Sequence, residues 1–441
     1  MFMAFDKQLL QSIIKEFTID SEQLQEIAAN FRQDLKLGLN DPEKSSLRML
    51  KSYVGLPTGK ETGEYLALDF GGTNVRVSRI KLEGSGKFNI IKKVGKPLIL
   101  PGEYNYVGVG SKAEGMFAFL AELINEAIDG DHETKFYLGH TFSFPSTQLN
   151  LYDAKLIIWT KEFATEGVEG KVVNDLLKNA LVKIGAANVE PISVINDTVA
   201  VLLSAAYQHE STYIGSIYAT GQNNCYLESS IHDPANVGEG GMILNLESGG
   251  FMKLTPNRFD KEYDENSEKP GEQRLEKMVS GRYMGELLSM TLSELFNEKG
   301  KEYNFTSIDI SSILMDGSID GNRIAAVIKE KTGHDVDAIT AKEIKELASA
   351  IVIRSARIVT ATYVGIIWQR AGSGKITKQH IAVDGSVYEK MPLVKESINQ
   401  ALSELLGEDA ANVETMLDTG GSGLGAAISA AMAASNGTTL Q

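Results

Sequence analysis

The segment from Leu66 to Val77, L-A-L-D-F-G-G-T-N-V-R-V, most constrains the fold of this chain. An apolar run enters a Gly-Gly turn and an alternating run leaves it, which predicts a β-hairpin. The glycines let backbone N–H groups approach an anion closely, and hydroxyl, amide and carboxylate side chains surround them. We interpret the turn as a candidate phosphate-binding loop, with an ordinary hairpin turn as the alternative.

A second hairpin follows the same design. Residues 213–218 enter the turn A-T-G-Q-N-N, and residues 225–229 leave it. Two such hairpins suggest a duplicated architecture in which each half starts with strands and then alternates with helices. We therefore expect an α/β fold with two lobes around a cleft.

The remaining pattern adds helices and short apolar strands. Three-to-four spacing of apolar residues predicts helices over 6–17 and 21–37, with Gly38 as the stop of the second. Further expected helices cover 113–128, 172–184, 198–207 and 272–297, one long buried helix covers 340–370, and a glycine loop opens an alanine-rich helix at the end. Expected strands lie at 136–144, 192–195, 242–247 and 381–387.

Length and charge limit the classes of function. A chain of 441 residues is expected to form two domains. A net charge of −15 argues against a nucleic-acid partner, which needs a basic stripe. No apolar run long enough to span a bilayer and no secretory signal is recognised, and a single cysteine excludes internal disulfides. We expect a cytoplasmic protein without a membrane partner.

The segment Asn196-Asp197-Thr198 is the sharpest local candidate for chemistry. An apolar strand delivers a carboxylate to its C-terminal end, where a helix begins. Ligands of open α/β sheets gather at that end of the strands. The alternative is that these residues only cap the helix, since Asn and Asp are good N-caps.

Together these segments resemble the hexokinase family over most of the chain, in the family's order. The matching segments are L-A-L-D-F-G-G-T-N-V-R-V, T-F-S-F-P-S (141–146), I-I-W-T-K-E-F (157–163), I-N-D-T-V-A (195–200), A-T-G-Q-N-N-C-Y (219–226), N-L-E (245–247), P-G-E-Q-R-L-E-K-M-V-S-G-R-Y-M-G-E-L (270–287), V-D-G-S-V-Y (383–388) and G-S-G-L-G-A-A (421–427). The resemblance implies a duplicated ribonuclease H-like fold, that of the actin-like ATPases. It also implies a small lobe of 61–192 with the C-terminal helix 425–437, and a large lobe of 1–60 and 198–424.

The resemblance also implies roles for individual residues. Asp197 would be the general base that accepts the proton of the sugar hydroxyl as it attacks ATP. Lys161 would contact the sugar and stabilise charge on the transferred phosphoryl group. The implied sugar-binding residues are Ser143, Thr160, Lys161, Asn196, Asp197, Asn223, Glu247 and Glu276.

ATP and Mg²⁺ are the implied co-substrate and cofactor. Asp69 would position Mg²⁺, directly or through water. The implied phosphate-binding residues are Asp69, Gly71, Gly72, Thr73, Asn74 and Arg76 in the first turn, and Thr220 and Gly221 in the second. The implied nucleoside-binding residues are Asp384, Gly385, Ser386, Gly421, Ser422 and Gly423.

Some positions depart from the family pattern. Ser248 follows Glu247 where the family prefers tryptophan, and Gln222 and Asn224 are bulkier or more polar than the residues usual beside Asn223. Ala219 replaces a usual glycine, and Gly420 and Leu424 stand where an acid and a basic residue are common. We expect the departure at Ser248 to alter sugar range, the one at Ala219 to restrict backbone approach in the second phosphate turn, and those at Gly420 and Leu424 to alter nucleotide affinity or choice.

The implied activity is ATP-dependent phosphorylation of glucose and related hexoses at the 6-hydroxyl, giving hexose 6-phosphate for glycolysis. One alternative is a sugar sensor that keeps the fold without turnover. Another is a kinase that prefers fructose or mannose. The N-terminal helices are expected to cover the large lobe. The alternative is that one face of these helices forms a homodimer contact.

Overall fold

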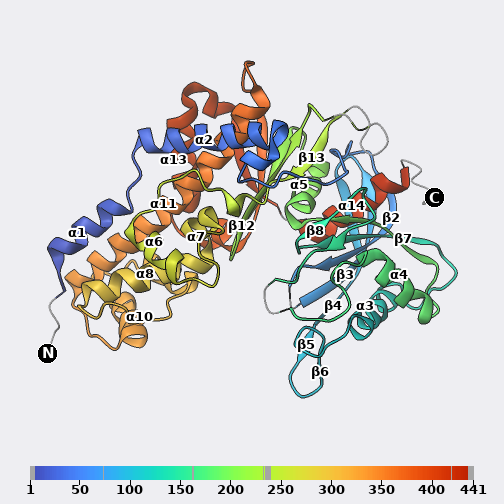
Figure 1. Cartoon of the computed structure of the whole chain (residues 1–441), viewed down its shortest axis with the longest axis horizontal. Helices are drawn as coiled ribbons and strands as arrows, with labels where there is room; N and C mark the ends of the chain where they lie inside the picture. Colours follow the sequence, from blue (N-terminus) through green and yellow to red (C-terminus); the bar gives the residue numbers. More distant parts are fainter. Residues whose placement is uncertain are drawn as a thin grey trace. The chain divides into compact units, whose positions relative to one another are not determined.

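The computed structural model describes residues 5–72, 74–160, 163–231, 233, 240–418 and 420–435. The chain divides into two compact units, coloured along the sequence in Figure 1. Unit 1 comprises Met1–Met49, Ser216–Asn224 and Leu246–Leu417, and unit 2 comprises Leu50–Gly215, Cys225–Asn245 and Asp418–Gln441.

A five-stranded sheet with the order β10-β7-β2-β3-β4 forms the centre of unit 2. Its strands are β2 (Thr62–Phe70), β3 (Asn74–Gly84), β4 (Lys87–Pro97), β7 (Phe136–Phe142) and β10 (Val189–Ile195). The pairs β2–β3 and β3–β4 are antiparallel, so the first predicted hairpin is confirmed. The pairs β2–β7 and β7–β10 are parallel, so these three strands end at the same edge.

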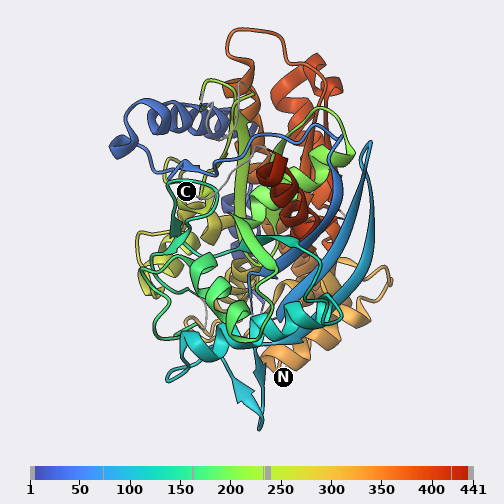
Figure 2. The ribbon, with the colours of Figure 1, turned by 90° about the vertical axis from the view of Figure 1, so that its right-hand side faces the viewer.

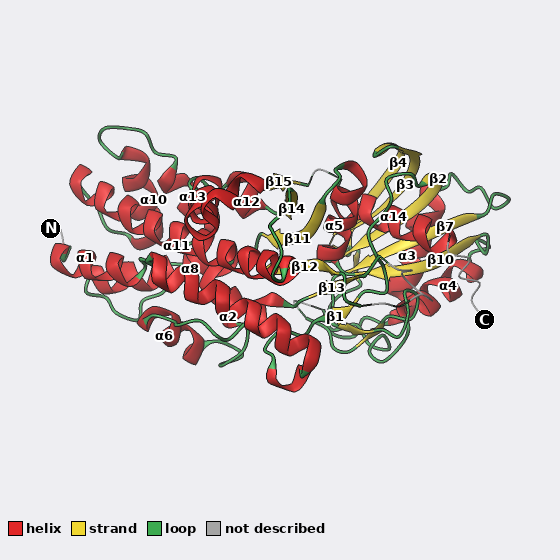
Figure 3. Cartoon of the chain, turned by 90° about the horizontal axis from the view of Figure 1, so that it is seen from above, coloured by secondary structure: helices red, strands yellow, loops and turns green. Residues whose placement is uncertain are grey.

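Alternation along β2 divides its side chains between two cores. Leu66, Leu68 and Phe70 belong to the core with α3 (Ala113–Ala127) and α4 (Val173–Lys183). Ala67 belongs to the other core, with α5 (Asp197–Gln208) and α14 (Gly421–Ser435). Figures 2 and 3 show the ribbons of these two helices beside the strands of the sheet. The same alternation places Asp69 on the side of α14, one residue before β2 ends.

The second sheet repeats this strand order and confirms the predicted duplication. Its order is β1-β13-β12-β11-β14-β15. The strands are β1 (Leu50–Lys51), β11 (Thr212–Tyr218), β12 (Gln222–Glu228), β13 (Met242–Asn245), β14 (Gln379–Asp384) and β15 (Val413–Leu417). From β15 to β13 the order matches that from β10 to β4, with β14–β15 parallel and β12–β13 antiparallel like their counterparts. Two further pairs are short: β5 (Ile99–Leu100) with β6 (Tyr104–Asn105), and β8 (Ser146–Thr147) with β9 (Lys155–Leu156).

Helices dominate unit 1 (Figure 1). The α-helices are α1 (Lys7–Glu16), α2 (Ser21–Asn40), α6 (Arg258–Asn266), α7 (Arg274–Val279), α8 (Gly281–Leu295), α9 (Ser307–Leu314), α10 (Asn322–Thr332), α11 (Ala338–Ala371), α12 (Ser386–Lys390) and α13 (Val394–Leu406). Short 3₁₀ turns are η1 (Pro42–Lys44), η2 (Ser248–Gly250) and η3 (Gly407–Asn412).

The long helix α11 is the predicted buried helix. By length and composition it is apolar enough to cross a membrane, in contrast to our expectation that no such run exists. However, 83% of its most apolar window is buried inside the protein, which is the burial of a core helix. It packs against α2 and α13.

The predicted helix stop at Gly38 is wrong. Gly38 lies inside α2, which continues to Asn40, and Gly38 is buried. A Cβ atom at this position would overlap with the side chain of Met49. The glycine is therefore a site of close packing, which a sequence pattern does not distinguish from a helix terminator.

The observed units differ in extent from the predicted lobes. Unit 2 includes 198–215 and 225–245, which the prediction placed in the large lobe. The reason is the close packing of α5 on α14: a Cβ at Gly425 would overlap with the carbonyl of Ala200. In addition, Ser204 Oγ donates to Asp418 Oδ1 at 2.8 Å. The lobes stay a prediction, because compactness alone does not determine which parts move together.

Candidate active site

The carboxyl ends of β2, β7 and β10 bring several predicted site residues to one edge of the unit 2 sheet. Asp69 is the last residue but one of β2, Ser143 directly follows β7, and Asn196 and Asp197 directly follow β10. All four residues are half-buried. This is the edge at which parallel strands of α/β proteins bind ligands.

The first hairpin turn touches this group. A Cβ at Gly71 would lie 2.6 Å from Ser143 Oγ, so a larger residue would displace that hydroxyl. The Ser143 N–H donates to the carbonyl of Phe70 at 3.4 Å. Open space surrounds Gly72, and Asn74 is exposed at the start of β3. The predicted site residue Thr73 lies outside the described residues.

Asp69 is a partly buried carboxylate whose charge is only partly compensated. Burial raises the pKa of its carboxyl group, while a hydrogen bond with Ser422 and the charge of Arg76 lower it and the charge of Asp197 raises it. The cross-strand pairing of residues 69 and 76 places Arg76 Nη1 3.6 Å from Asp69 Oδ2. The Arg76 side chain is 52% exposed, so its attraction is screened. A divalent cation, held directly or through water, would complete the compensation.

The cap predicted at the start of α5 is confirmed for Asn196. Its Oδ1 accepts hydrogen bonds from the Thr198 N–H at 2.9 Å and from Thr198 Oγ1 at 2.7 Å. Asp197 is the first residue of α5, and its Oδ1 accepts from the same Thr198 N–H at 2.8 Å. The N-terminal end of a helix favours negative charge, so this position stabilises the Asp197 carboxylate.

The predicted glycine loop is the first turn of α14. Gly421, Ser422 and Gly423 are helical and half-buried. Thr141 Oγ1 on β7 donates to the carbonyl of Ser422 at 2.9 Å, which fixes the helix start to the strand edge. The helix N-terminus can therefore present backbone N–H groups to an anion at this edge.

Asp418 is a structural partner of this helix that the sequence analysis missed. It accepts hydrogen bonds from the N–H groups of Gly420 at 3.2 Å and Gly421 at 2.9 Å. Burial raises the pKa of its carboxyl group, although these bonds and Ser204 oppose the shift. An acid three residues before a glycine-initiated helix is the signal that could have identified it.

The 157–163 segment is described only in part. Thr160 is half-buried, and its carbonyl accepts from the Phe163 N–H at 3.4 Å. Lys161 lies outside the described residues, so its two predicted roles stay predictions.

In unit 1, the second hairpin turn is held by two helices. The N–H groups of Gly281 and Arg282, at the start of α8, donate to the carbonyls of Ala219 at 2.8 Å and Thr220 at 3.2 Å. On the other side, the Gln222 N–H donates to Glu276 Oε2 of α7 at 3.2 Å. A Cβ at Gly221 would lie 2.9 Å from that same oxygen, so glycine permits the approach.

Three predicted sugar ligands come together beside this turn. The Ser248 N–H, next to Glu247, donates to Asn223 Oδ1 at 3.0 Å. Glu247 has a left-handed backbone with φ of 51°, which is uncommon for a residue other than glycine. At Gly249, a Cβ would lie 3.1 Å from the Cβ of Glu276, so the 247–249 turn packs directly on α7.

The predicted nucleoside residues Asp384, Gly385 and Ser386 form the junction between β14 and α12. Gly385 has φ of 133°, and a Cβ there would overlap with the carbonyl of Tyr218 at the end of β11. Only glycine fits this junction. Asp384 is half-buried and Ser386 is exposed.

Among the described residues, no group of three or more His, Cys, Asp or Glu side chains could hold a metal ion. A metal site at Asp69 would therefore depend on one protein carboxylate, with water and a bound phosphate chain as the other ligands. Mg²⁺ commonly binds in this way.

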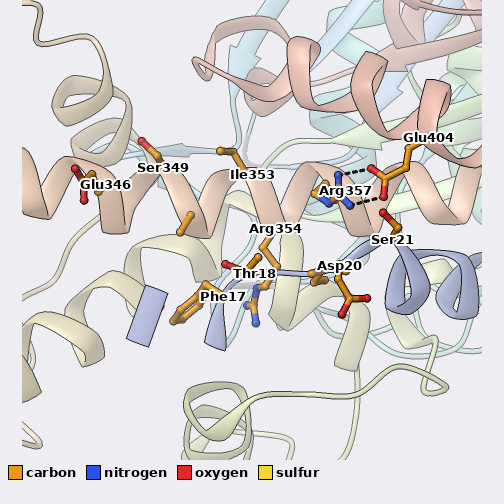
Figure 4. A pocket seen from close by; sticks show the side chains of 12 residues that line it. Phe17, Thr18, Asp20, Ser21, Glu346, Ser349, Ile353, Arg354, Arg357 and Glu404 are labelled. Atoms are coloured by element: carbon orange, nitrogen blue, oxygen red, sulfur yellow. Dashed lines mark hydrogen bonds and ion pairs between the residues drawn. The ribbon is translucent and has the colours of Figure 1, made fainter. Parts of the chain in front are cut away.

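A cavity of about 560 Å³ in unit 1 contains none of the predicted site residues (Figure 4). Both arginines that line it form ion pairs. Arg357 makes a bidentate ion pair with Glu404 at 2.8 and 3.0 Å, and Arg354 makes another with Asp260 at 2.7 and 2.8 Å. We therefore do not include this cavity in the candidate active site.

Comparison with solved structures shows which class of protein has this fold and site. The chain is similar to a crystal structure of a hexokinase at 33% identity and a TM-score of 0.86, covering 97% of this chain and 99% of the other. It is also similar to the glucose complex of Schistosoma mansoni hexokinase at 31% identity and a TM-score of 0.81, covering 96% and 99%. These matches define a sugar kinase with the actin-like ATPase fold, as predicted.

The chain belongs to the hexokinase family. Two hexokinase family models match residues 9–207 and 213–432. Hexokinase-1 of Schizosaccharomyces pombe is 32% identical over 96% of this chain and 90% of its own length. The resemblance found in the sequence is thereby confirmed.

Proposed function

We propose that the chain transfers the γ-phosphoryl group of ATP to the 6-hydroxyl of glucose and related hexoses. The observation that carries the proposal is the meeting of Asp69, Ser143 and Asp197 at one strand edge, beside the N-terminal end of α14. In a hexokinase, this combination of an acid, a hydroxyl and anion-binding backbone suits phosphoryl transfer to an alcohol.

In this proposal, Asp197 is the general base. Its carboxylate accepts the proton of the hexose 6-hydroxyl as that oxygen forms a bond to the γ-phosphorus. The bond between the γ-phosphorus and the bridging oxygen breaks, and ADP leaves with the electron pair. The helix N-terminus and the Thr198 N–H orient the carboxylate before the reaction.

The proposed hexose ligands are carboxylates, amides, hydroxyls and one lysine. They are Ser143, Thr160, Lys161, Asn196, Asp197, Asn223, Glu247 and Glu276. Hydroxyl groups of a sugar are both donors and acceptors, so a set of carboxylates, amides and hydroxyls satisfies them. A sugar that lacks a hydroxyl would leave a polar group unpaired, which is how such a set discriminates between sugars.

The phosphate chain would be bound by the first turn, with Thr220 and Gly221 of the second turn as further ligands; the first-turn residues are Asp69, Gly71, Gly72, Thr73, Asn74 and Arg76. Asp69 would hold Mg²⁺, which neutralises charge on the phosphates. Asp384, Gly385, Ser386, Gly421, Ser422 and Gly423 would bind the nucleoside. The product, a hexose 6-phosphate, would serve glycolysis in the cytoplasm.

A coupled assay with Mg-ATP and a panel of hexoses tests the proposal. We expect phosphorylation of at least one hexose, and a loss of roughly 10²-fold or more in kcat for Asp197→Ala. Asp197→Asn should keep hexose binding in calorimetry. Hexose binding without turnover by the wild-type protein would instead establish a sensor, and the ratio of kcat/KM values would show whether fructose or mannose is preferred.

A further inference from the structure

A continuous chain of buried hydrogen bonds lies behind the Glu247 turn. Ser248 Oγ donates to Gln222 Oε1 at 3.2 Å, and Gln222 Nε2 donates to Asn224 Oδ1 at 3.1 Å. Asn224 Nδ2 then donates to Thr362 Oγ1 of α11 at 3.0 Å, and that hydroxyl donates to the carbonyl of Val359 at 2.7 Å. Every member thus donates to the next, and the last donates to the backbone.

All four side chains are buried, with exposed fractions of 0 to 2%. Burying polar side chains is favourable only when each has a partner, and a fully connected network holds its members in one arrangement. This series of hydrogen bonds therefore fixes the rotamers of Gln222 and Asn224, which flank Asn223 on β12. It also fixes Ser248 relative to the long core helix α11.

Ser248 connects this series of hydrogen bonds to the proposed sugar ligands. Its hydroxyl is the first donor of the series, while its N–H donates to Asn223 Oδ1 at 3.0 Å. The preceding residue is Glu247, whose left-handed backbone needs support from its surroundings. Positions 222, 224 and 248 are also three of those at which the sequence departs from the family pattern. In the structure, the residues at these three positions are linked by hydrogen bonds.

We propose that Gln222, Asn224 and Thr362 are positioning residues that act through Ser248 to hold Asn223 and Glu247 for hexose binding. This inference rests on the proposed function, because it concerns the hexose ligands of that site. It predicts that the hydroxyl of Thr362, inside the core helix, controls the KM for the hexose. The KM for ATP and the value of kcat depend on other groups.

The test compares Thr362→Val with Thr360→Val. Both threonines are fully buried in α11, but the Thr360 hydroxyl donates to the carbonyl of Ala356 and takes no part in the chain. We expect Thr362→Val to raise the hexose KM roughly three- to tenfold, the effect of one lost hydrogen bond, with kcat changed less than about twofold. Thr362→Ser should restore the wild-type KM, and Thr360→Val should leave it unchanged.

A double variant supplies the second measurement. If the chain acts as one unit, Ser248→Ala with Thr362→Val should raise the hexose KM no more than the larger single effect. Equal KM values for Thr362→Val and Thr360→Val, or additive single effects, would overturn the proposal while the wild-type enzyme remains active. A wild-type protein that neither binds nor phosphorylates any hexose would overturn the proposed function itself and this inference with it.

Discussion

Asp69 and Asp197 repel each other across the strand edge, since the carboxylate of Asp197 contributes to the raised pKa of the Asp69 carboxyl, for which burial is the main cause. Asp69 lies on β2 and Asp197 begins the helix that follows β10, and β7 separates these two strands in the sheet. Two acids that share one edge in this way favour the binding of a cation, and they reduce stability when no cation is bound.

The first prediction concerns pH. The folded-state pKa of Asp69 is raised above its ordinary value of 3.8, so the folded state binds the proton more tightly than the unfolded chain. Asp69 therefore contributes its whole share to the free energy of unfolding at pH values below 3.8, and this contribution is lost as pH rises through the folded-state pKa. We therefore expect Asp69→Asn to gain stability over the wild-type protein as pH rises from acid to neutral, without Mg²⁺, measured by denaturant unfolding at several pH values.

Asp197→Asn provides the matched background for this experiment. Removing the charge of Asp197 should reduce the pH-dependent stability difference that Asp69→Asn produces, because one cause of the raised pKa of Asp69 is gone. A stability difference that is the same at every pH would contradict the assignment.

The second prediction concerns Glu276. Its carboxylate accepts from the Gln222 N–H at 3.2 Å and lies beside Gly221, so Glu276→Gln changes charge with little change in shape. We expect the hexose KM to rise about 10-fold or more, the cost of weakening hydrogen bonds to a charged group. Steady-state kinetics with each substrate varied in turn should show a much smaller change in the KM for ATP.

Glu272→Gln is the control for that variant, because Glu272 is exposed and lies two residues before α7 begins. It makes the same change of charge close by in the chain. An equal rise in hexose KM for both variants would mean that overall charge, and not the position of Glu276, is responsible.

The third prediction concerns two glycines of α14. A Cβ at Gly425 would overlap with the carbonyl of Ala200, whereas the nearest atom to a Cβ at Gly423 is Ser78 Oγ at 3.9 Å. Gly425→Ala should therefore lower the free energy of unfolding by about 1–3 kcal/mol or more. Gly423→Ala should leave it unchanged or raise it by up to about 1 kcal/mol. Thermal unfolding compares the two, and equal midpoints would refute the packing argument.

The fourth prediction concerns two arginines one turn apart on α11. Arg354 is 2% exposed and pairs with the buried Asp260, so Arg354→Met leaves a buried carboxylate without its partner. We expect a loss of about 3–5 kcal/mol in unfolding free energy. Arg357→Met breaks the similar pair with the exposed Glu404 and should cost about 1 kcal/mol or less. Denaturant unfolding of both variants gives the comparison, and similar losses would show that burial does not set the cost.

Local patterns predicted the parts of the site that lie within one element. The run around Asp69 has the period of a strand and ends in glycines, and the run before Asp197 is an apolar strand followed by a helix cap. The second pattern also predicted that Asp197 lies at a strand end where ligands bind, and the first predicted that Asp69 belongs to a phosphate-binding turn. The structure places both at the same edge.

Other features depend on residues that are distant in the sequence. Asn224 and Thr362 contact each other across a large separation in the chain, and neither position carries a local signal for that contact. Gly38 shows the same limit, since a glycine that admits Met49 and a glycine that ends a helix have the same sequence pattern. Such contacts are decided by tertiary packing and not by propensity.

The packing of α14 has a consequence for biosynthesis. Gly139 on β7 and Gly425 both lack side chains so that α14 can lie against the sheet and α5. The ribosome completes β2, β7 and β10 long before it reaches Gly421. Until α14 is synthesised, the apolar sheet surface that α14 covers in the folded protein therefore stays exposed. During that interval the growing polypeptide is exposed to aggregation, and this exposure should fall once α14 has emerged and packed on the sheet.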